Sequence, residues 1–197
     1  HGLMGFDMNG KTAGIIGTGK IARILIRILQ GFGMKVVAYD LYPDEKYARE
    51  VGISYVSLDG LYAQADMISL HVPLTDQTKN MIDAQSIAKM KEGTIIINTS
   101  RGQLIHTNAL IEGLKSKKIA AAGLDVYEEE EGYFYEDQSD KIIDDDVLAR
   151  LLSFNNVIVT SHQGFFTEEA LTNIAETTLQ NAEAFRTGME LKNEIYL

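Results

Sequence analysis

A glycine-rich turn near the start of the chain has the residue types and spacing needed to hold a dinucleotide. Gly17 and Gly19, followed by Ala22, form a Gly-x-Gly-x-x-Ala turn between an apolar strand-like run and a helical one. Gly17 permits the tight turn, Gly19 lets the backbone approach a pyrophosphate, and Ala22 keeps the helix near the strand. The start of that helix offers free N–H groups to phosphates. The glycines could instead serve packing alone.

A carboxylate at the end of the next predicted strand narrows the choice of dinucleotide. Asp40 follows Gly19 by 21 residues. A carboxylate at this place accepts hydrogen bonds from the hydroxyls of the adenosine ribose and repels a 2′-phosphate. The pattern therefore predicts NAD rather than NADP. Lys20 does not alter this prediction, because it precedes Asp40 by a full strand–helix unit and can contact the pyrophosphate.

Two further side chains, suited to anion binding and proton transfer, follow predicted strands. Arg101 comes just after the apolar run Thr94–Asn98, and His162 comes after Val157–Thr160. The carboxyl ends of strands are where open α/β sheets place ligands. A guanidinium can hold a carboxylate and polarise the carbonyl beside it, and an imidazole can exchange a proton near neutral pH. Arg101 could instead pair with the acidic stretch, and His162 could cap the next helix.

A run of four glutamates lies within an acidic, irregular stretch. Glu128–Glu131 stands in the segment from about Tyr127 to Asp146. Such a charge run is usually a solvated face, and composition does not choose among the four glutamates, although a long irregular stretch is often functional. The sequence shows no cluster with metal-ligand spacing, so no metal site is predicted.

The elements that must position these side chains alternate between short β-branched strands and helices. Several strands are apolar throughout, which is typical of a sheet covered by helices on both faces. We therefore expect an α/β fold of the Rossmann type, a doubly wound parallel sheet with helices on both faces. The predicted strands are Thr12–Ile16, Lys35–Tyr39, Met67–Leu70, Thr94–Asn98, Ala120–Leu124 and Val157–Thr160. The predicted helices are Ile21–Gln30, Glu45–Glu50, Leu58–Gln64, Ala84–Met90, Thr107–Ser116 and Thr167–Arg186.

The composition is ordinary for a globular domain. The 197 residues are 45% hydrophobic and 23% charged, with a net charge of −10 and no cysteine. Disulfides, thiolate nucleophiles and cysteine-ligated metals are thereby excluded, and the negative charge argues against nucleic acid or an anionic membrane as the main partner. No run approaches the ~18–20 apolar residues that span a bilayer. We expect no signal peptide at the start and a cytoplasmic location.

Five segments resemble, in the same order, those of a known enzyme family. They are Gly17–Ile21, His71–Thr75, Asn98–Gly102, Gly123–Glu130 and Thr160–Gln163. The resemblance is to the D-specific 2-hydroxyacid dehydrogenases, and it runs from about Gly2 to the C-terminus. It implies hydride transfer between NAD and a small 2-oxo acid, with pyruvate and D-lactate as the expected pair.

The resemblance also implies a role for each catalytic side chain. Arg101 would bind the substrate carboxylate, His162 would exchange the proton, and Glu130 would favour the protonated imidazole of His162. Counting along the family motif gives Glu130 this role, and a slip to a neighbouring glutamate is left open. The further cofactor contacts that the resemblance implies are Lys20, Ile21, Val72, Pro73, Thr78, Thr99 and Asp125.

Four positions depart from the family pattern, and one of them, Ala22 in place of the commoner third Gly, is tolerated. Thr78 stands where Asn is common, His106 where Asp is usual, and Gly164 where Ala usually follows the His-Gln pair. We expect His106 to alter the local hydrogen bonds at its turn. Gly164 is expected to loosen the loop that carries His162.

The resemblance predicts two parts in this chain. Residues 1–166 would form the NAD-binding domain, and residues 167–197 a helix and tail that return to a substrate domain missing from the chain. Two alternatives stay open, namely an NAD-binding module or non-enzymatic NAD-sensing regulator, and a dehydrogenase for a larger 2-oxo acid. The last predicted helix has an apolar face at helical spacing, which predicts self-association. The dimer contact that the family usually makes through its nucleotide-binding domain leads to the same prediction, a homodimer or higher oligomer. The residues of that face are Leu171, Ile174, Ala175, Thr178, Leu179, Ala182 and Phe185.

Overall fold

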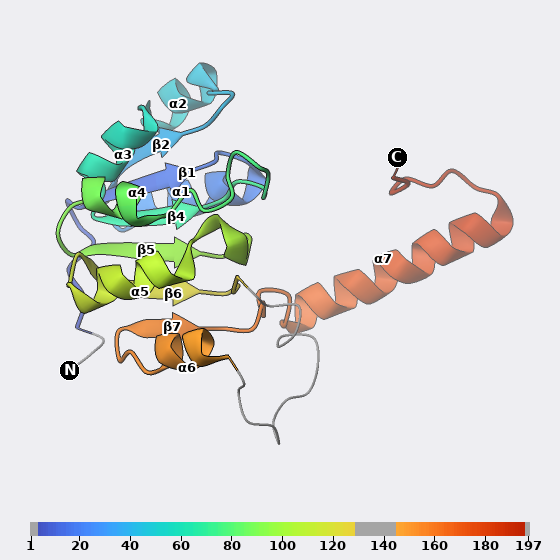
Figure 1. The fold of residues 1–197 in the computed structure, drawn as a ribbon. Coiled ribbons are helices and arrows are strands. Elements are labelled where there is room, and N and C mark those ends of the chain that lie inside the picture. Colours follow the sequence, from blue (N-terminus) through green and yellow to red (C-terminus); the bar gives the residue numbers. More distant parts are fainter. Residues whose placement is uncertain (1–3, 129–144, 196–197) are drawn as a thin grey trace. The chain divides into compact units, whose positions relative to one another are not determined.

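The structure is a computed structural model that describes residues 4–128 and 145–195. The chain divides into two units, His1–Ser161 and His162–Leu197. The first unit contains a sheet with helices packed against it, and the second contains one long helix (Figure 1). Each unit is described by itself.

A seven-stranded parallel sheet forms the centre of the first unit, in the order β3-β2-β1-β4-β5-β6-β7. The strands are β1 (Thr12–Ile16), β2 (Lys35–Tyr39), β3 (Ser54–Tyr55), β4 (Met67–Leu70), β5 (Thr94–Asn98), β6 (Ile119–Leu124) and β7 (Val157–Val159). From β1 the chain proceeds outward to β2 and β3, and then crosses back to β4 on the other side of β1. The order therefore reverses between β1 and β4, where such sheets bind ligands.

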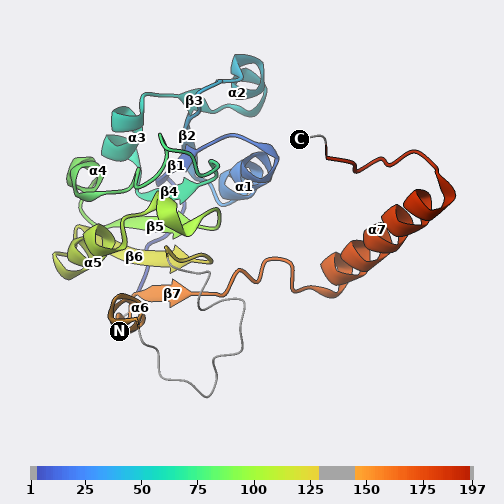
Figure 2. The ribbon, with the colours of Figure 1, turned by 45° about the vertical axis from the view of Figure 1, so that its right-hand side comes forward.

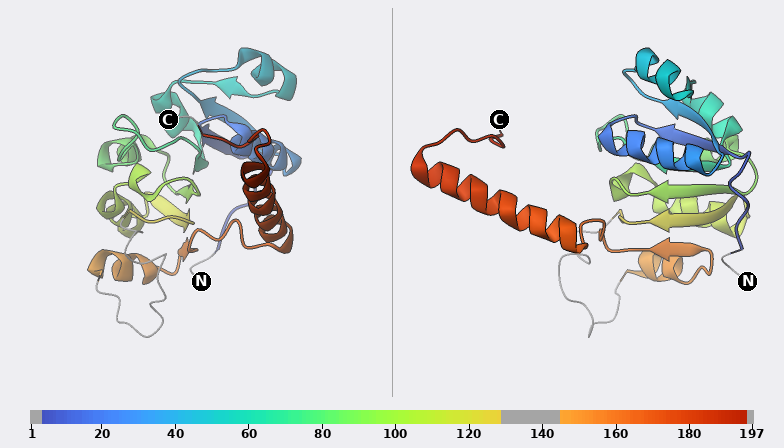
Figure 3. Two further views of the ribbon diagram at one scale, coloured as in Figure 1. Left: turned by 90° about the vertical axis from the view of Figure 1, so that its right-hand side faces the viewer. Right: turned by 180° about the vertical axis from the view of Figure 1, so that it is seen from behind.

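Helices cover both faces of this sheet (Figures 2 and 3). The helices of the first unit are α1 (Lys20–Gly31), α2 (Glu45–Val51), α3 (Leu58–Gln64), α4 (Ala84–Lys89), α5 (Thr107–Lys115) and α6 (Asp146–Leu152), with a short 3-10 helix, η1, at Gly102–Leu104. Helices α1 and α2 share one apolar core with β1 and β2, while α3 to α6 bury a second core on the opposite face. The predicted doubly wound Rossmann-type fold is confirmed.

Alternation along the strands divides the apolar side chains between these two cores. In β1, Ala13 and Ile15 pack with Ile26 of α1, whereas the neighbouring Ile16 packs in the core of α3 to α6. Successive side chains of a strand point to opposite faces, so an apolar run such as β1 can fill both cores at once. Because β1 and α1 pack together in one of these cores, α1 begins just beyond the end of β1, after the glycine turn.

The predicted elements agree with the structure to within one or two residues, and three short elements were not predicted. Strand β3 has two residues and pairs only with Val37 and Ala38. Helix α6 begins at the end of the acidic stretch, where the Asp145 side chain accepts from the N–H groups of Val147 and Leu148. The third is η1. Strand β3 is too short for a periodic pattern and depends on its pairing with β2, whereas α6 is as long as α2 and α3 and was missed beside the acidic stretch.

The second unit contains α7 (Glu168–Thr187). The Thr167 side chain caps its start by accepting from the N–H of Ala170, and Gly188 ends it in the left-handed conformation. None of its residues is buried, although Leu179 and Phe185 are large and apolar. Among the described residues, no helix is long and apolar enough to cross a bilayer.

Candidate functional site

The predicted site residues of the first unit lie at one edge of the sheet. Because all seven strands are parallel, their carboxyl ends share that edge. The glycine turn follows β1, Asp40 follows β2, Val72 follows β4, Arg101 follows β5 and Asp125 follows β6. The first three surround the point where the strand order reverses.

The glycine turn owes its shape to two different constraints. Gly17 has a φ of 91°, and a Cβ there would lie 2.7 Å from the backbone oxygen of His71. Gly19, at the start of α1, has a φ of −69°, and a Cβ there would meet no protein atom within 4 Å. The protein itself therefore requires glycine at position 17. The open space in front of Gly19 fits the approach of a pyrophosphate to the backbone.

Substitution of these two glycines by alanine is expected to separate folding from binding. Gly17→Ala should lower the free energy of unfolding by about 2–3 kcal/mol, because the positive φ and the His71 contact both oppose a Cβ. Gly19→Ala should leave the thermal unfolding midpoint nearly unchanged and weaken NADH binding by roughly tenfold or more. Calorimetric titration with NADH and thermal denaturation measure the two effects. Unaltered NADH affinity in Gly19→Ala would contradict a pyrophosphate at this turn.

A cavity of about 390 Å³ opens beside the glycine turn. Its walls include six of the predicted cofactor residues, which are Gly17, Gly19, Asp40, Val72, Pro73 and Thr78. The Thr78 hydroxyl donates to the Pro73 backbone oxygen at 2.7 Å, so this threonine fixes the loop after β4. Lys20, Ile21, Thr99 and Asp125 are not lining residues of this cavity, and Ile21 is 73% exposed.

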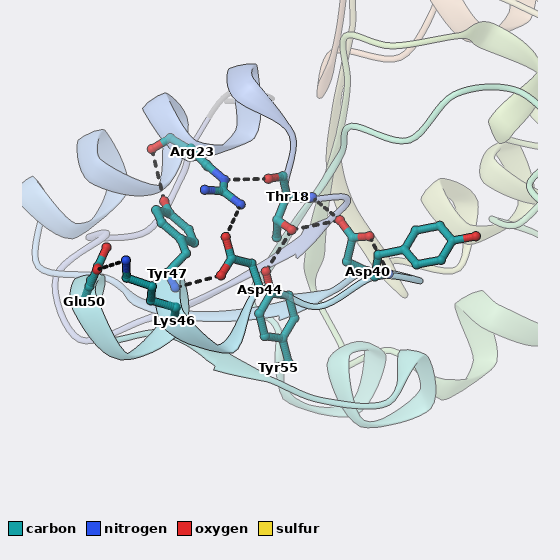
Figure 4. A network of polar contacts seen from close by, with 9 residues as sticks. Thr18, Arg23, Asp40, Asp44, Lys46, Tyr47, Glu50 and Tyr55 are labelled. Carbon is teal, nitrogen blue, oxygen red and sulfur yellow. Dashed lines mark hydrogen bonds and ion pairs between the residues drawn. The ribbon is translucent and has the colours of Figure 1, made fainter.

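The carboxylate of Asp40 is held in one orientation by three donors (Figure 4). One oxygen accepts from the backbone N–H of Thr18 at 2.7 Å and from the Thr18 hydroxyl at 2.8 Å. The other accepts from the N–H of Tyr42 at 3.0 Å. Partial burial alone would raise the pKa of Asp40, but the hydrogen bonds from Tyr42 and Thr18, with the nearby charge of Arg23, hold that pKa below its usual range. Asp40 is therefore ionised at neutral pH.

His71 also lines the cavity, and burial lowers the pKa of its imidazole. Its Nε2 is hydrogen-bonded to the hydroxyl of the buried Ser69 at 2.9 Å. A His with a lowered pKa is neutral at pH 7 and adds no charge to the cavity. These features support the structural role of His71 that the resemblance implies.

The loop that carries Arg101 is fixed by two polar side chains of its own segment. The Asn98 side chain donates to the backbone oxygen of Arg101 at 2.9 Å and accepts from the N–H of Ser100 at 3.0 Å. The Ser100 hydroxyl donates to the backbone oxygen of Val72 at 2.7 Å, which links this loop to the one after β4. The Arg101 side chain itself is exposed and donates to the Ser100 oxygen at 2.8 Å. Its guanidinium thus stays accessible at the ligand edge of the sheet.

The acidic stretch starts in close contact with the residue after Arg101. A Cβ on Gly102 would lie 1.8 Å from the backbone oxygen of Tyr127, so the two backbones approach more closely than any side chain would allow. The Tyr127 hydroxyl donates to Asp145 at 2.7 Å, and the Glu128 carboxylate accepts from the N–H of Thr107 at 3.0 Å. Glu128 is thus occupied at the start of α5. Glu130, the predicted catalytic glutamate, lies outside the described residues.

His106 shows how this chain accommodates its departure from the family pattern. Its Nδ1 accepts from the N–H of Ala109 at 3.3 Å and so caps the start of α5, as an Asp side chain would. Together with Glu128 at Thr107, it satisfies two of the N–H groups that have no partner within the helix. The altered hydrogen bonding expected at this turn is therefore a different cap at an intact helix start.

Asp125 belongs to the same edge but lies away from the cavity. Its backbone N–H donates to the Asn98 oxygen at 2.9 Å, and its carboxylate accepts from the Thr160 hydroxyl. These bonds join the ends of β5, β6 and β7 into one rim. The role of Asp125 as a cofactor contact stays a prediction.

His162 is the first residue of the second unit and has an unusual backbone conformation. It is half-buried, and its φ of 52° lies in the left-handed region. Residues other than glycine rarely adopt this backbone conformation, and strained residues of this kind are common at functional sites. The conformation supports a functional role for His162, which stays a prediction.

Sequence reasoning missed two residues that shape the site, Thr18 and Tyr55. The hydroxyl of Thr18 contacts both Asp40 and the Tyr55 hydroxyl, at 2.8 and 2.9 Å. Thr18 could have been found from the sequence, because it lies between the two glycines of the turn. Tyr55 had none, because its contact spans 37 residues and depends on the two-residue strand β3. Within residues 4–128 and 145–195, no group of residues is suited to hold a metal.

The chain belongs to the D-isomer specific 2-hydroxyacid dehydrogenase family, because residues 1–164 match the profile of its NAD binding domain. It is 50% identical to D-lactate dehydrogenase of Escherichia coli, over 99% of this chain and 59% of that protein. It is also 50% identical to aromatic 2-oxoacid reductase of Clostridium sporogenes, over 98% of this chain and 58% of that protein. A solved D-lactate dehydrogenase with NAD+ from Lactobacillus jensenii has a TM-score of 0.88 and 35% identity, covering 98% and 58% of the two chains. The chain therefore spans less than two thirds of the length of these relatives.

Proposed function

We propose that this protein is an NAD-dependent dehydrogenase that interconverts a small 2-oxo acid and the D-2-hydroxy acid, with pyruvate and D-lactate as the pair. The strongest support is the cavity of about 390 Å³ at the reversal of strand order, beside an ionised and oriented Asp40. Ribose hydroxyls can donate to that carboxylate, and a 2′-phosphate would be repelled. Arg101 is exposed at the same edge, where a substrate carboxylate can reach it.

We propose one role for each catalytic side chain. When bound, NADH supplies the hydride that adds to C2 of the 2-oxo acid. Arg101 binds the substrate carboxylate and polarises the carbonyl. His162 donates a proton to the carbonyl oxygen in reduction and accepts the hydroxyl proton in oxidation, while Glu130 favours the protonated imidazole. The proposed cofactor contacts are Gly17, Gly19, Lys20, Ile21, Asp40, Val72, Pro73, Thr78, Thr99 and Asp125.

The division of the chain belongs to the same proposal. Residues 1–166 act as the NAD-binding domain, and residues 167–197 form a helix and tail that return to a substrate domain. The second candidate function, for the chain taken alone, is a cofactor-binding module without turnover. It is supported by the match to aromatic 2-oxoacid reductase, which covers 58% of that protein. A cytoplasmic location stays a prediction.

Cofactor binding and turnover, measured on the same chain, test these candidates. NADH and NADPH are titrated calorimetrically, and NADH oxidation is followed with pyruvate and with an aromatic 2-oxo acid such as phenylpyruvate. The same assays are run on the protein expressed from its full reading frame. Turnover with NADH supports the dehydrogenase. If the aromatic acid is turned over faster than pyruvate, the proposed substrate becomes an aromatic 2-oxo acid. NADH binding by the chain without turnover supports the module, and no NADH binding by either protein contradicts both.

A second copy of this chain is the proposed partner of an apolar stripe on α1. Ile21, Ile24 and Ile28 are 73%, 63% and 50% exposed, and Phe32 beyond the helix end is 57% exposed. The spacing of these residues places them along one side of the helix. Exposed apolar stripes of this kind mark association surfaces. The face of α7 that carries Leu179 is the alternative surface.

Charge substitution on each helix should identify the surface used. We expect light scattering to give at least a dimer for the unaltered chain and a monomer for Ile24→Lys, because a buried unpaired charge opposes association. Leu152→Lys, at another exposed apolar residue, is the control and should remain oligomeric. Dissociation of Leu179→Lys alone would assign the interface to α7, and a monomeric unaltered chain would contradict both surfaces.

A further inference from the structure

A chain of two hydroxyl groups ends on the carboxylate of Asp40 (Figure 4). The Tyr55 hydroxyl lies 2.9 Å from the Thr18 hydroxyl, which lies 2.8 Å from an Asp40 oxygen. Asp40 is ionised and can only accept, so the single proton of the Thr18 hydroxyl points to it. Tyr55 must therefore donate to Thr18. The direction of both hydrogen bonds is thus fixed.

This chain of hydroxyls limits what Asp40 can accept from a ligand. A carboxylate has about four acceptor positions. Thr18 fills two on one oxygen, and the Tyr42 N–H fills one on the other. The position that is left belongs to the oxygen bonded by Tyr42. Asp40 lines the cavity, so it presents one oriented acceptor that a ribose hydroxyl can satisfy.

Arg23, in the first turn of α1, is held by its own neighbours. The Arg23 Nε donates to the backbone oxygen of Thr18 at 3.0 Å, and its Nη2 forms an ion pair with Asp44 at 2.8 Å. The guanidinium also lies over the Tyr47 ring, 4.1 Å from the centroid. Arg23 is thus already paired with Asp44, although its charge also helps to hold the pKa of Asp40 low.

We propose that Thr18 and Tyr55 are positioning residues that set the preference for NADH over NADPH by fixing the carboxylate of Asp40. The proposal rests on the proposed function, because it assumes that the cavity binds a nicotinamide dinucleotide. A ribose hydroxyl donates to the fixed acceptor. A 2′-phosphate carries about −1.5 to −2 charges at pH 7 and offers acceptors, so it meets a carboxylate that cannot turn away.

Removal of the Thr18 hydroxyl should reduce this preference. Thr18→Val keeps the size of the side chain and loses the donor to Asp40. We expect the NADH dissociation constant to rise by roughly tenfold, about the worth of one hydrogen bond to a charged group. The NADPH dissociation constant should stay the same or fall, because the carboxylate can then turn away from a 2′-phosphate. Thr18→Ser restores the hydroxyl and should restore the preference. Thermal denaturation of each variant checks that the site remains folded.

Tyr55 acts only through Thr18 in this proposal, and a double-mutant cycle tests that order. Tyr55→Phe alone should lower the preference for NADH by roughly threefold, and it should have no further effect in the Thr18→Val background. Tyr47→Phe is the matched control, because its hydroxyl contacts the Arg23 oxygen at 3.5 Å and takes no part in the chain to Asp40. Tyr47→Phe should keep the preference of the unaltered protein.

The outcomes separate this proposal from the proposed function. If the unaltered chain prefers NADH and folded Thr18→Val keeps the same preference, the positioning role is wrong and the proposed function stands. If the effects of Tyr55→Phe and Thr18→Val on the preference for NADH are additive, Tyr55 does not act through Thr18 and the proposal is wrong. If neither the unaltered chain nor the protein from the full reading frame binds NADH, the proposed function and this proposal both fail.

Discussion

Replacement of His162 by Gln is expected to lower kcat for 2-oxo acid reduction by roughly 10²- to 10⁴-fold. Glutamine keeps a polar side chain of similar reach, but it cannot donate a proton to the carbonyl oxygen at neutral pH. The Kd for NADH should stay within about twofold, since the cavity that carries six of the proposed cofactor contacts is built from the first unit. Turnover is measured on the protein from its full reading frame, with NADH binding measured in parallel.

A neighbouring substitution controls for disturbance of the loop. Ser161→Ala changes an exposed residue next to His162 and should leave kcat within about twofold. Near-normal turnover in His162→Gln would remove the proton-transfer role. Equal losses of kcat in both variants would assign the effect to loop structure.

Replacement of Gly102 by Ala is expected to cost roughly 3 kcal/mol of folding free energy and to disturb the neighbourhood of Arg101. The added Cβ would lie 1.8 and 2.0 Å from the backbone O and C of Tyr127, and 2.6 Å from the Glu128 nitrogen. All three atoms are backbone, so no rotamer change relieves the overlap. Either β5 and its loop or the start of the acidic stretch must move. Thermal and urea denaturation measure the loss, and turnover should fall with it.

Gly164→Ala is the matched control for this steric argument. A Cβ at Gly164 would meet no atom within 4 Å, and its φ lies outside the left-handed region. The same chemical change should therefore be neutral or should stabilise the chain by a few tenths of a kcal/mol, through lower entropy of the unfolded state. If Gly102→Ala were as stable as Gly164→Ala, the close approach of the two backbones would be wrong.

The strands, the long helices and the glycine turn could be predicted from the sequence because their signals are local. Apolar runs such as Thr94–Asn98 need only their own residues to indicate a buried strand. The turn at Gly17 and Gly19 is encoded within a few positions, as is the cap of α7 by Thr167. Strand β3 could not be predicted, since it has two residues and depends on its pairing with β2. Helix α6 was missed, although its seven residues and its cap by Asp145 are local.

The candidate site divides in the same way. The positions of Arg101 and Asp40 at strand ends followed from their order in the sequence, since parallel strands bring their carboxyl ends to one edge. The orientation of Asp40 did not follow, because it depends on Thr18, which is 22 residues away, and on Tyr55 beyond it. The hydrogen bond from the N–H of Thr107 to the Glu128 carboxylate could likewise not be predicted, because the two residues are 21 positions apart and only the fold brings them together.

The sequence alone determined the Rossmann-type sheet, the family of its NAD-binding domain and the positions suited to cofactor and substrate. These follow from periodicity and from motifs that span a few residues. The tertiary structure decided which glycine the protein itself requires, how Asp40 is oriented and which glutamate is already occupied. Such features arise from contacts between residues far apart in the chain, whose distances no local pattern contains.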